Sequence, residues 1–497
     1  MDSHVLDIDR GEINIRRIFW ILVGFETITM LIFLYGDLVK YGNLIFYAYF
    51  IGIILTPLFL LLIPIEPTIG IVLMLLATGF DFLGRIVETT TRIRFNFTYF
   101  HIALFVTFIS TFLNLVLRRR TVIRSVNLWP PLIVFLLVLS YTLIYTPDFP
   151  QGAYTFTRIV VMGLLTLIVI ECVDKIWKVK LLISSMIIIP VGISILTVYQ
   201  LVTEGAFYAP KVVKMATTLG LAVYRSTGTF ENPNQLACFL MIGIIVPFGM
   251  LFLKNQNIVT KLLLIAALIV TSIGIVTTFS RGGWVSSIVG LAVIVALHKK
   301  WSFFYIFIGI VILMTVVLSI KIPQLWEVVF DRFGSIFNPL ADDSSSSRVS
   351  LLKTGIWMWQ DHPLFGVGMR GFPKLYYDYV DPNMPHILIE VNEPHTIQVE
   401  ILAEEGLIGF VVATWLFFTV FFHGFRTSLR MKNDYLRSVQ IVSFALLFAF
   451  IVNFTFATDL TNNSFWITVG MLYAVPLVEK INNNVNNASN SSLEPVC

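Results

Sequence analysis

The sequence carries little charge and few cysteines for its length. Only 13% of its 497 residues are Asp, Glu, Lys or Arg, about half the share found in soluble domains. This scarcity excludes an ordinary soluble protein. The three cysteines, Cys172, Cys238 and Cys497, show neither a disulfide framework nor metal-site spacing. We therefore expect no extracellular disulfide.

The N-terminus lacks the features of a cleavable signal peptide. Residues 1–17 are polar and contain acidic as well as basic side chains, and a full-length apolar segment follows them. The net charge is only +4. We interpret it as loop charge that orients a membrane protein, and we expect no nucleic-acid partner.

Long apolar segments dominate the rest of the chain. Hydrophobic residues make up 57% of it, the mean hydropathy is +0.84, and runs of the roughly 20 residues that cross a bilayer recur throughout. The sequence predicts an all-α polytopic membrane protein of about 12–14 transmembrane helices. The expected spans lie near 17–35, 43–64, 68–83, 97–117, 131–146, 157–172, 181–201, 235–253, 262–279, 284–297, 303–320, 407–425, 438–457 and 463–478.

The distribution of Lys and Arg predicts the orientation. If the N-terminus is cytoplasmic, 19 of the 34 Lys and Arg residues lie in inner segments and nine in short outer loops. The remainder lie in a long loop, 321–396, which is exempt from the positive-inside rule. We therefore predict that both termini are cytoplasmic and that the long loop is outside.

The outer loop is the longest polar stretch, and it contains a predicted amphipathic helix. A run of serines precedes Val349, Leu352, Ile356 and Trp359, which recur at helical spacing before Pro363 ends the segment. A helix with this apolar stripe is expected to lie flat at the membrane surface.

His395 is the first candidate functional residue. Asn392 can cap a helix and Pro394 fits its first turn, which would place His395 near the positive end of the helix dipole. A histidine there is expected to stay neutral and able to accept a proton. The alternative is an interfacial histidine that only caps or packs.

Arg281 is the second candidate, in the segment TTFSRGGW between two apolar spans. An arginine there is costly unless it faces a polar cavity or an anion, and Gly282 and Gly283 permit close approach of the backbone. The alternative is an arginine that snorkels to the interface.

Three further arginines complete an outer cationic set. Arg225 lies in the turn-rich segment YRSTGTFENPNQ, whose polar groups either contact a ligand or merely cap the next helix through Asn-Pro-Asn. Arg348 and Arg370 belong to the outer loop, and some of these arginines are expected to be ordinary solvated charges.

This set suits transfer of a sugar from a lipid diphosphate. The departing diphosphate must be stabilised, and guanidinium groups match phosphate oxygens bidentately. Asp342 and Asp343 are a lone acidic pair that we read as a solvated turn. We therefore expect no metal site and no cofactor, and a neutral histidine as general base.

Three motifs in order resemble the O-antigen ligase and O-antigen polymerase-like membrane glycosyltransferases. They are STGTFENPNQLA, FSRGGW, and the loop RVSLLKTGIWMWQDHPLFGVGMRGF followed by His395-Thr396, nine residues, Gly406, two residues and Gly409. The resemblance covers roughly residues 220–425. Thr396 stands where the family more often has Asn.

The resemblance implies a membrane-embedded glycosyltransferase fold with a capping outer loop. It implies metal-independent, inverting transfer of a glycan from undecaprenyl diphosphate to an acceptor, outside the bacterial cytoplasmic membrane. By position, His395 would be catalytic or would position substrate. Arg225 and Arg281 would bind the diphosphate, Arg281 acting in catalysis as well, with Arg348 and Arg370 as weaker candidates. The expected partners are the lipid-linked glycan, the bilayer, and flippase and chain-length regulator proteins.

On this basis the chain divides into four regions. They are an N-terminal bundle (1–201), an O-antigen ligase-like catalytic region (202–425), C-terminal transmembrane helices (426–480) and an Asn/Ser-rich tail (481–497) expected to be disordered in the cytoplasm.

We favour a polysaccharide polymerase, while a ligase with another acceptor shares every motif. A lipid-linked glycan or small-solute transporter is the alternative of a different class; it would show repeated halves and broken spans.

Overall fold

The structure is a computed structural model, and it describes most of the chain after residue 61. The described residues are 62–80, 85–88, 96–117, 124–202, 213–216, 222–303, 343–380, 394, 396–456 and 459–491, with isolated residues between 305 and 316. All of them belong to one compact unit, Leu60–Cys497. The expected spans at 17–35, 43–64 and 303–320 lie almost entirely outside the described residues.

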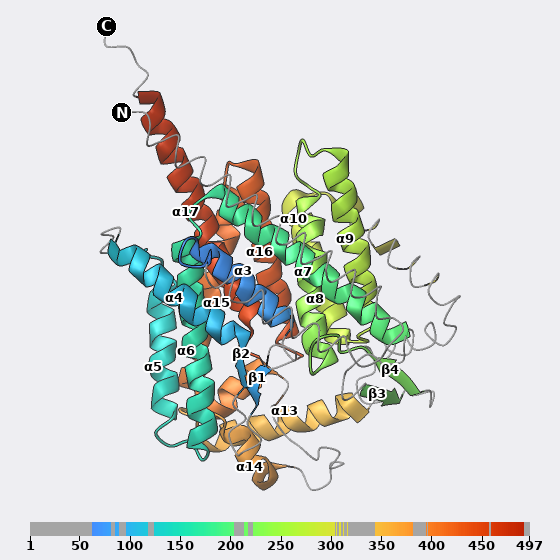
Figure 1. The fold of residues 1–497 in the computed structure, drawn as a ribbon. Helices are drawn as coiled ribbons and strands as arrows, with labels where there is room; N and C mark the ends of the chain where they lie inside the picture. Colours follow the sequence, from blue (N-terminus) through green and yellow to red (C-terminus); the bar gives the residue numbers. More distant parts are fainter. Residues whose placement is uncertain are drawn as a thin grey trace. The chain divides into compact units, whose positions relative to one another are not determined.

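Helices form nearly all of the described structure, which confirms the all-α polytopic membrane fold (Figure 1). Nine of them, among the described residues, are long and apolar enough to cross a membrane. They are α4 (Tyr99–Leu117), α6 (Phe149–Cys172), α7 (Ile176–Val202), α8 (Pro233–Met250), α9 (Ile258–Val276), α10 (Arg281–His298), α15 (Ile397–Arg430), α16 (Asp434–Asn453) and α17 (Asn463–Ser491). Two apolar helices are shorter, α3 (Pro67–Gly79) and α5 (Trp129–Thr142).

Helices α8, α16 and α17 form the centre of the bundle. In α8, 89% of the apolar window is buried, against 28% in α15, and α8 is apolar around its whole circumference, as expected of a buried helix. Helix α8 packs against α7, α9, α10 and α16, while α17 packs against α6 and α16. Helices α6 and α17, far apart in the sequence, therefore share one core.

Two short antiparallel strand pairs accompany the helices, and the sequence analysis does not predict them. Strand β1 (Arg85–Glu88) pairs with β2 (Asn96–Thr98), and β3 (Val213–Ala216) pairs with β4 (Ala222–Arg225). Each pair precedes a helix. The second pair matters for function, because β4 ends at Arg225, directly before the turn that leads into α8.

The outer loop contains the expected helix, but another face of it packs on the protein. Helix α13 (Asp343–Asp361) buries Leu351, Thr354 and Met358. Gly355 brings its backbone against Val399, so closely that a Cβ there would overlap that side chain. The predicted stripe is offset by one position, and Leu352 within it is exposed. Its contact with a membrane surface stays a prediction.

A second short helix, α14 (Gly371–Tyr379), completes the described part of the outer loop. Phe372 and Tyr376 on α14 pack with Met358 of α13 and Ala403 of α15 in one apolar cluster. Burial, and then a hydrogen bond to the Asp361 carboxylate, raise the pKa of the Tyr379 hydroxyl. The two loop helices are therefore fixed to each other and to the first turns of α15.

The connector between α13 and α14 docks into a break in α15. Gly406 has φ 67° and ψ −166° inside this helix, a conformation open essentially only to glycine. The backbone N–H of Leu407 donates to the Pro363 carbonyl at 2.9 Å, and that of Ile408 donates to the Leu364 carbonyl at 3.1 Å. The outer loop thus supplies acceptors for helix donors that the break leaves without their usual partners.

Replacing Gly406 by alanine is expected to destabilise the protein. The backbone conformation costs on the order of 1–3 kcal/mol for a non-glycine residue, and a Cβ would overlap the Leu364 carbonyl group. The measurement is the thermal unfolding temperature in detergent. Gly192→Ala in α7 is the control, because a Cβ at Gly192 meets nothing within 4 Å. Equal unfolding temperatures for the two variants would contradict the structural role of the break.

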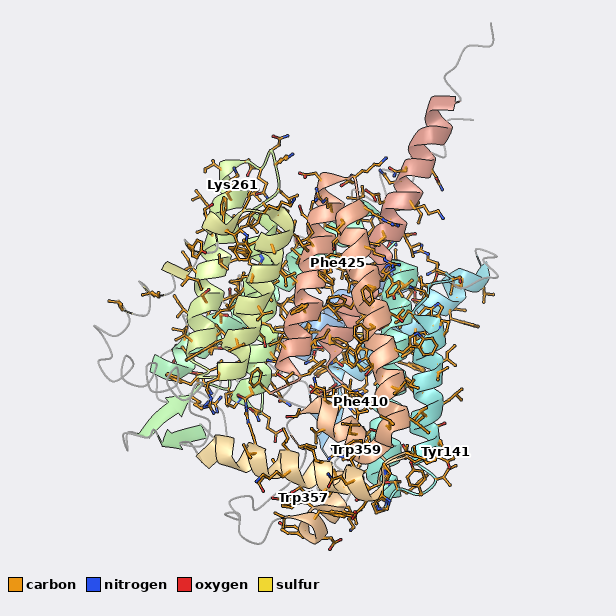
Figure 2. All side chains as sticks on the ribbon, turned by 180° about the vertical axis from the view of Figure 1, so that it is seen from behind. Tyr141, Lys261, Trp357, Trp359, Phe410 and Phe425 are labelled. Atoms are coloured by element: carbon orange, nitrogen blue, oxygen red, sulfur yellow. The ribbon has the colours of Figure 1, made fainter. Side chains whose placement is uncertain are left out.

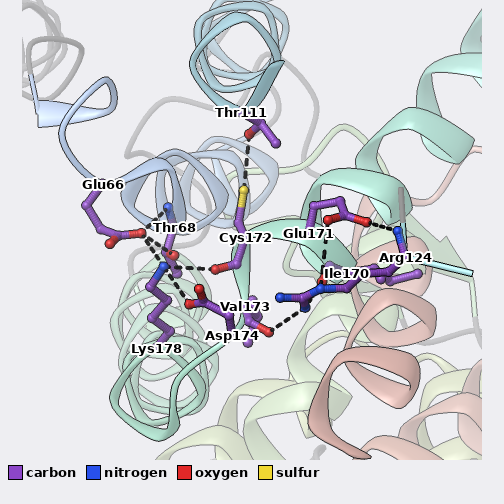
Figure 3. A network of polar contacts seen from close by, with 10 residues as sticks. All are labelled: Glu66, Thr68, Thr111, Arg124, Ile170, Glu171, Cys172, Val173, Asp174 and Lys178. Atoms are coloured by element: carbon purple, nitrogen blue, oxygen red, sulfur yellow. Dashed lines mark hydrogen bonds and ion pairs between the residues drawn. The ribbon is translucent and has the colours of Figure 1, made fainter. Parts of the chain in front are cut away.

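The opposite end of the bundle is held by buried ion pairs (Figure 3). The Lys178 ammonium, only 8% exposed, lies 3.0 Å from Glu66 and 2.9 Å from Asp174, and donates to the Cys172 carbonyl. Glu66 also caps α3 by accepting from Thr68. Lys178 therefore ties the start of α3 to the α6–α7 connection.

Lys178→Met is expected to destabilise the protein by roughly 3–5 kcal/mol, because it leaves two partly buried carboxylates without their cation. Lys175→Met, at an exposed position of the same connection, is the matched control. Chemical unfolding in mixed micelles compares the two variants. A Lys178→Met protein as stable as the control would show that the ion pairs of Lys178 make no net contribution to the free energy of unfolding.

The C-terminal tail differs from its prediction. Helix α17 continues to Ser491, so the segment expected to be disordered from residue 481 is helical as far as the structure describes it. Asn and Ser are poor nucleators of helix, but extending an existing helix avoids the nucleation cost. Residues 492–497 lie outside the described part of the chain.

Candidate functional site

Two of the sequence motifs meet where α8 and α10 begin. The Arg225 Nε donates to the Thr278 carbonyl at 2.8 Å, and one of its Nη atoms donates to Asn234 Oδ1 at 2.9 Å. The Ser280 hydroxyl donates to the same Asn234 oxygen at 2.9 Å. The segment leading into α8 is therefore bound to the α9–α10 turn that presents Arg281.

Local sequence explains both helix starts. Asn232 caps α8 by accepting from the Asn234 N–H at 2.8 Å, and Pro233 occupies the first helical position. Ser280 caps α10. Phe279, just before it, is buried with φ 48°, a left-handed conformation that costs about 1–2 kcal/mol for a residue with a Cβ. Such backbone strain is typical of functional turns.

Glycines bring the two helix starts close together. A Cβ at Gly283 would lie 2.6 Å from the Ala237 Cβ on α8, and one at Gly282 would lie 3.0 Å from the Phe456 Cβ. The N-termini of α8 and α10 therefore approach each other, and neither helix has an acidic residue in its first turn. Each N-terminus carries roughly half a positive charge, and Arg225 and Arg281 add two full charges. The arrangement favours an anion.

His395 lies outside the described residues, but both of its neighbours are described. Helix α15 begins at Ile397 with Thr396 as its N-cap. The placement of His395 in a first helical turn stays a prediction. The Ile397 N–H donates to the Phe454 carbonyl at 3.2 Å. Phe456, two residues on, contacts Gly282. The start of α15 and the Arg281 turn therefore both lie against the 454–456 segment.

The other two predicted arginines belong to the outer loop. Arg348 is half-buried on α13. Arg370 precedes α14 with φ 60°, and its backbone N–H donates to Glu404 Oε2 at 2.7 Å. The N–H of Phe372 donates to Glu404 Oε1 at 3.1 Å. The Arg370 backbone thus helps to join the loop to α15, whereas the Arg225 side chain is hydrogen-bonded to the α9–α10 turn that precedes Arg281.

The sequence analysis does not predict the side chains that hold this site in place. Besides Asn234 and Ser280, Gln200 of α7 accepts through Oε1 from the backbone N–H groups of Thr227 at 3.0 Å and Gly228 at 2.8 Å. Asn234 could have been suspected from the sequence, because the Asn-Pro-Asn motif contains two asparagines and capping α8 needs only one of them. Gln200 gives no signal beyond being a buried amide in an apolar span.

Within the described ranges, no three His, Cys, Asp or Glu side chains gather in a way that would hold a metal ion. His395 and several outer-loop acids fall outside those ranges. Metal-independent chemistry therefore stays a prediction.

The fold defines a multi-pass membrane protein with a polar loop docked against α15. Residues 265–414 match the family model described as O-antigen ligase, less than a third of the chain. The match includes Arg281, the outer loop, His395 and the Gly406–Gly409 motif, and Arg225 precedes it. No curated protein matches the chain. Residues 265–414 are thus similar to the O-antigen ligase family, as the motifs predict.

Asn234→Ala is expected to lower stability and to weaken anion binding. Asn234 fixes the Arg225 guanidinium, and a hydrogen bond to a charged group contributes about 1.5–3 kcal/mol, so we expect roughly tenfold weaker binding of inorganic pyrophosphate. The measurement is the shift in unfolding temperature across a pyrophosphate titration.

Asn232→Ala is the matched control for this experiment, two residues away. Loss of the α8 cap costs about 0.5–2 kcal/mol of stability and should leave the pyrophosphate affinity unchanged. If both variants lost affinity equally, Asn234 would act only through the fold of the segment.

Proposed function

We propose that the protein is a surface polysaccharide polymerase. It joins repeat units carried on undecaprenyl diphosphate, on the outer face of the bacterial cytoplasmic membrane. The observation that carries the proposal is the set of hydrogen bonds that joins Arg225 and Asn234 to the turn directly before Arg281, which lies in the region that matches the O-antigen ligase family.

In this proposal the cationic site holds the diphosphate of the donor. A hydroxyl oxygen of the acceptor unit attacks the anomeric carbon from the face opposite the diphosphate, which inverts its configuration. The bond from that carbon to the diphosphate oxygen breaks, and the electron pair leaves with the diphosphate. Arg225 and Arg281 stabilise the charge that develops on it.

His395 is proposed to accept the proton of the attacking hydroxyl or to orient that hydroxyl. Its neighbours support this assignment, because the start of α15 and the Arg281 turn contact the same segment, 454–456. A base is useful only within hydrogen-bond reach of the proton that it removes. Arg348 and Arg370 are proposed as secondary contacts to the glycan or the diphosphate.

The proposed orientation has both termini in the cytoplasm and the site on the outside. Figure 2 supports it, since Lys261 lies at one end of the bundle and Trp357, Trp359 and Tyr141 lie at the other. Lysines of the short inner loops are expected at the cytoplasmic end, and aromatic residues at an interface. Flippase and chain-length regulator proteins are the partners that such a polymerase would need.

The test reconstitutes purified protein with a lipid-diphosphate-linked repeat unit and separates the products on a gel, with chelator present. The expected result is a ladder from the wild type and none from His395→Ala or Arg281→Ala. Arg158→Ala is the control, because Arg158 lies on α6 against Tyr154, away from the proposed site, and its ladder should persist.

Three other outcomes would replace the proposal. One glycan block added to a second acceptor would identify a ligase. A ladder lost with chelator and restored by a divalent ion would contradict metal-independent transfer. Lipid-linked sugar crossing the bilayer without any transfer would identify a transporter.

A further inference from the structure

A groove lies along the part of α15 farthest from the candidate site. Its volume is about 400 Å³. Trp415, Phe418 and Phe422 recur along one face of α15 and are each about half exposed. The groove is lined by Asn127, Trp415, Phe418, Thr419, Phe422, His423, Arg426, Thr427 and Arg430.

The apolar part of the groove has the length of one membrane leaflet. Arg426 lies eleven positions after Trp415, and at 1.5 Å per residue this separation is roughly 16 Å. Half of a bilayer's hydrocarbon core is about 15 Å. If Arg426 lies at the interface, Trp415 lies near the middle of the membrane. The groove can therefore hold an acyl chain along its full depth.

The inner part of the groove is fixed by packing. The ring of His423 stacks on that of Tyr473 of α17 at a centroid distance of 4.0 Å. The Thr427 hydroxyl donates to the His423 carbonyl at 2.7 Å, and the Gln440 side chain of α16 donates to Thr427 at 2.6 Å. These contacts hold α15 against α16 and α17 along the inner part of the groove.

One end of the groove is cationic. Arg426 and Arg430 are one helical turn apart and therefore share a face, and Asn127, at the start of the α5 segment, lines the same end. Both arginines are exposed, and within the described part of the chain neither forms an ion pair with a carboxylate. The negative C-terminal end of the α15 dipole amounts to only about half a charge, so the two arginines leave this end of the groove positively charged.

We infer that this groove binds one anionic phospholipid of the membrane, with its phosphate on Arg426 and Arg430 and an acyl chain along Trp415, Phe418 and Phe422. The cationic end selects the negative headgroup, and the leaflet-length apolar lining selects a membrane lipid over a soluble phosphate. By the predicted orientation this is the cytoplasmic leaflet. The site is independent of the proposed transfer reaction.

Native mass spectrometry of the detergent-purified full chain tests this inference, with phosphatidylglycerol and phosphatidylcholine as probes. The expected result is one tightly held phosphatidylglycerol, bound at least tenfold more strongly than phosphatidylcholine. Arg426→Gln/Arg430→Gln should remove that preference. Thr419→Trp, which fills the apolar part without changing charge, should weaken phosphatidylglycerol binding as well.

Lys254→Gln/Lys261→Gln is the matched control, because it removes the same charge at the same end of the bundle and should leave binding unchanged. An equal loss in this control would show that diffuse surface charge attracts the lipid, and would overturn the site. Equal retention of both lipids by the wild type, or full binding by Thr419→Trp, would overturn it too. Unfolding temperatures of all variants separate lost binding from lost fold.

Discussion

One amide oxygen joins the two halves of the candidate site. Asn234 Oδ1 accepts from both Arg225 and Ser280, and so connects the approach to α8 with the cap of α10. Two helix N-termini and two guanidinium groups repel one another at short range. The oxygen dipoles of Asn234 and of the Thr278 carbonyl reduce this repulsion without contributing a negative charge. The site can therefore be assembled while staying attractive to an anion.

The two ends of the bundle treat charge in different ways. At the end with Lys178, ammonium and guanidinium groups face carboxylates: Lys178 faces Glu66 and Asp174, and Arg124 faces Glu171. There the pairs join connections between helices. At the other end, Arg225 donates to two neutral acceptors, the Thr278 carbonyl and Asn234 Oδ1. The first arrangement joins helices through ion pairs, whereas the second orients a guanidinium group through hydrogen bonds to neutral oxygens.

Hydropathy predicts most of the described bundle, because a span needs only length and apolar content. Interactions between distant residues are harder to predict. The packed face of α13 differs from the predicted stripe because Gly355 allows close contact with Val399. Apolar residues occur on both faces of that helix, so their spacing does not show which face packs. The pairing of Arg225 with Asn234 depends on side-chain direction, which spacing along the chain does not determine. The start of α15 at Ile397, with Thr396 as its N-cap, also differs from the predicted cap at Asn392.

The break at Gly406 has a consequence for how the outer loop evolves. Carbonyl groups of Pro363 and Leu364 accept the hydrogen bonds that α15 residues would accept in an unbroken helix. The loop is therefore part of the hydrogen-bonding of α15. A loop joined to a sheet or bundle only by its ends can be exchanged between related proteins as a module. This loop is also joined along its length, so an exchanged loop must follow the same backbone path to leave no α15 N–H group without an acceptor. Loop and helix should therefore vary together in evolution.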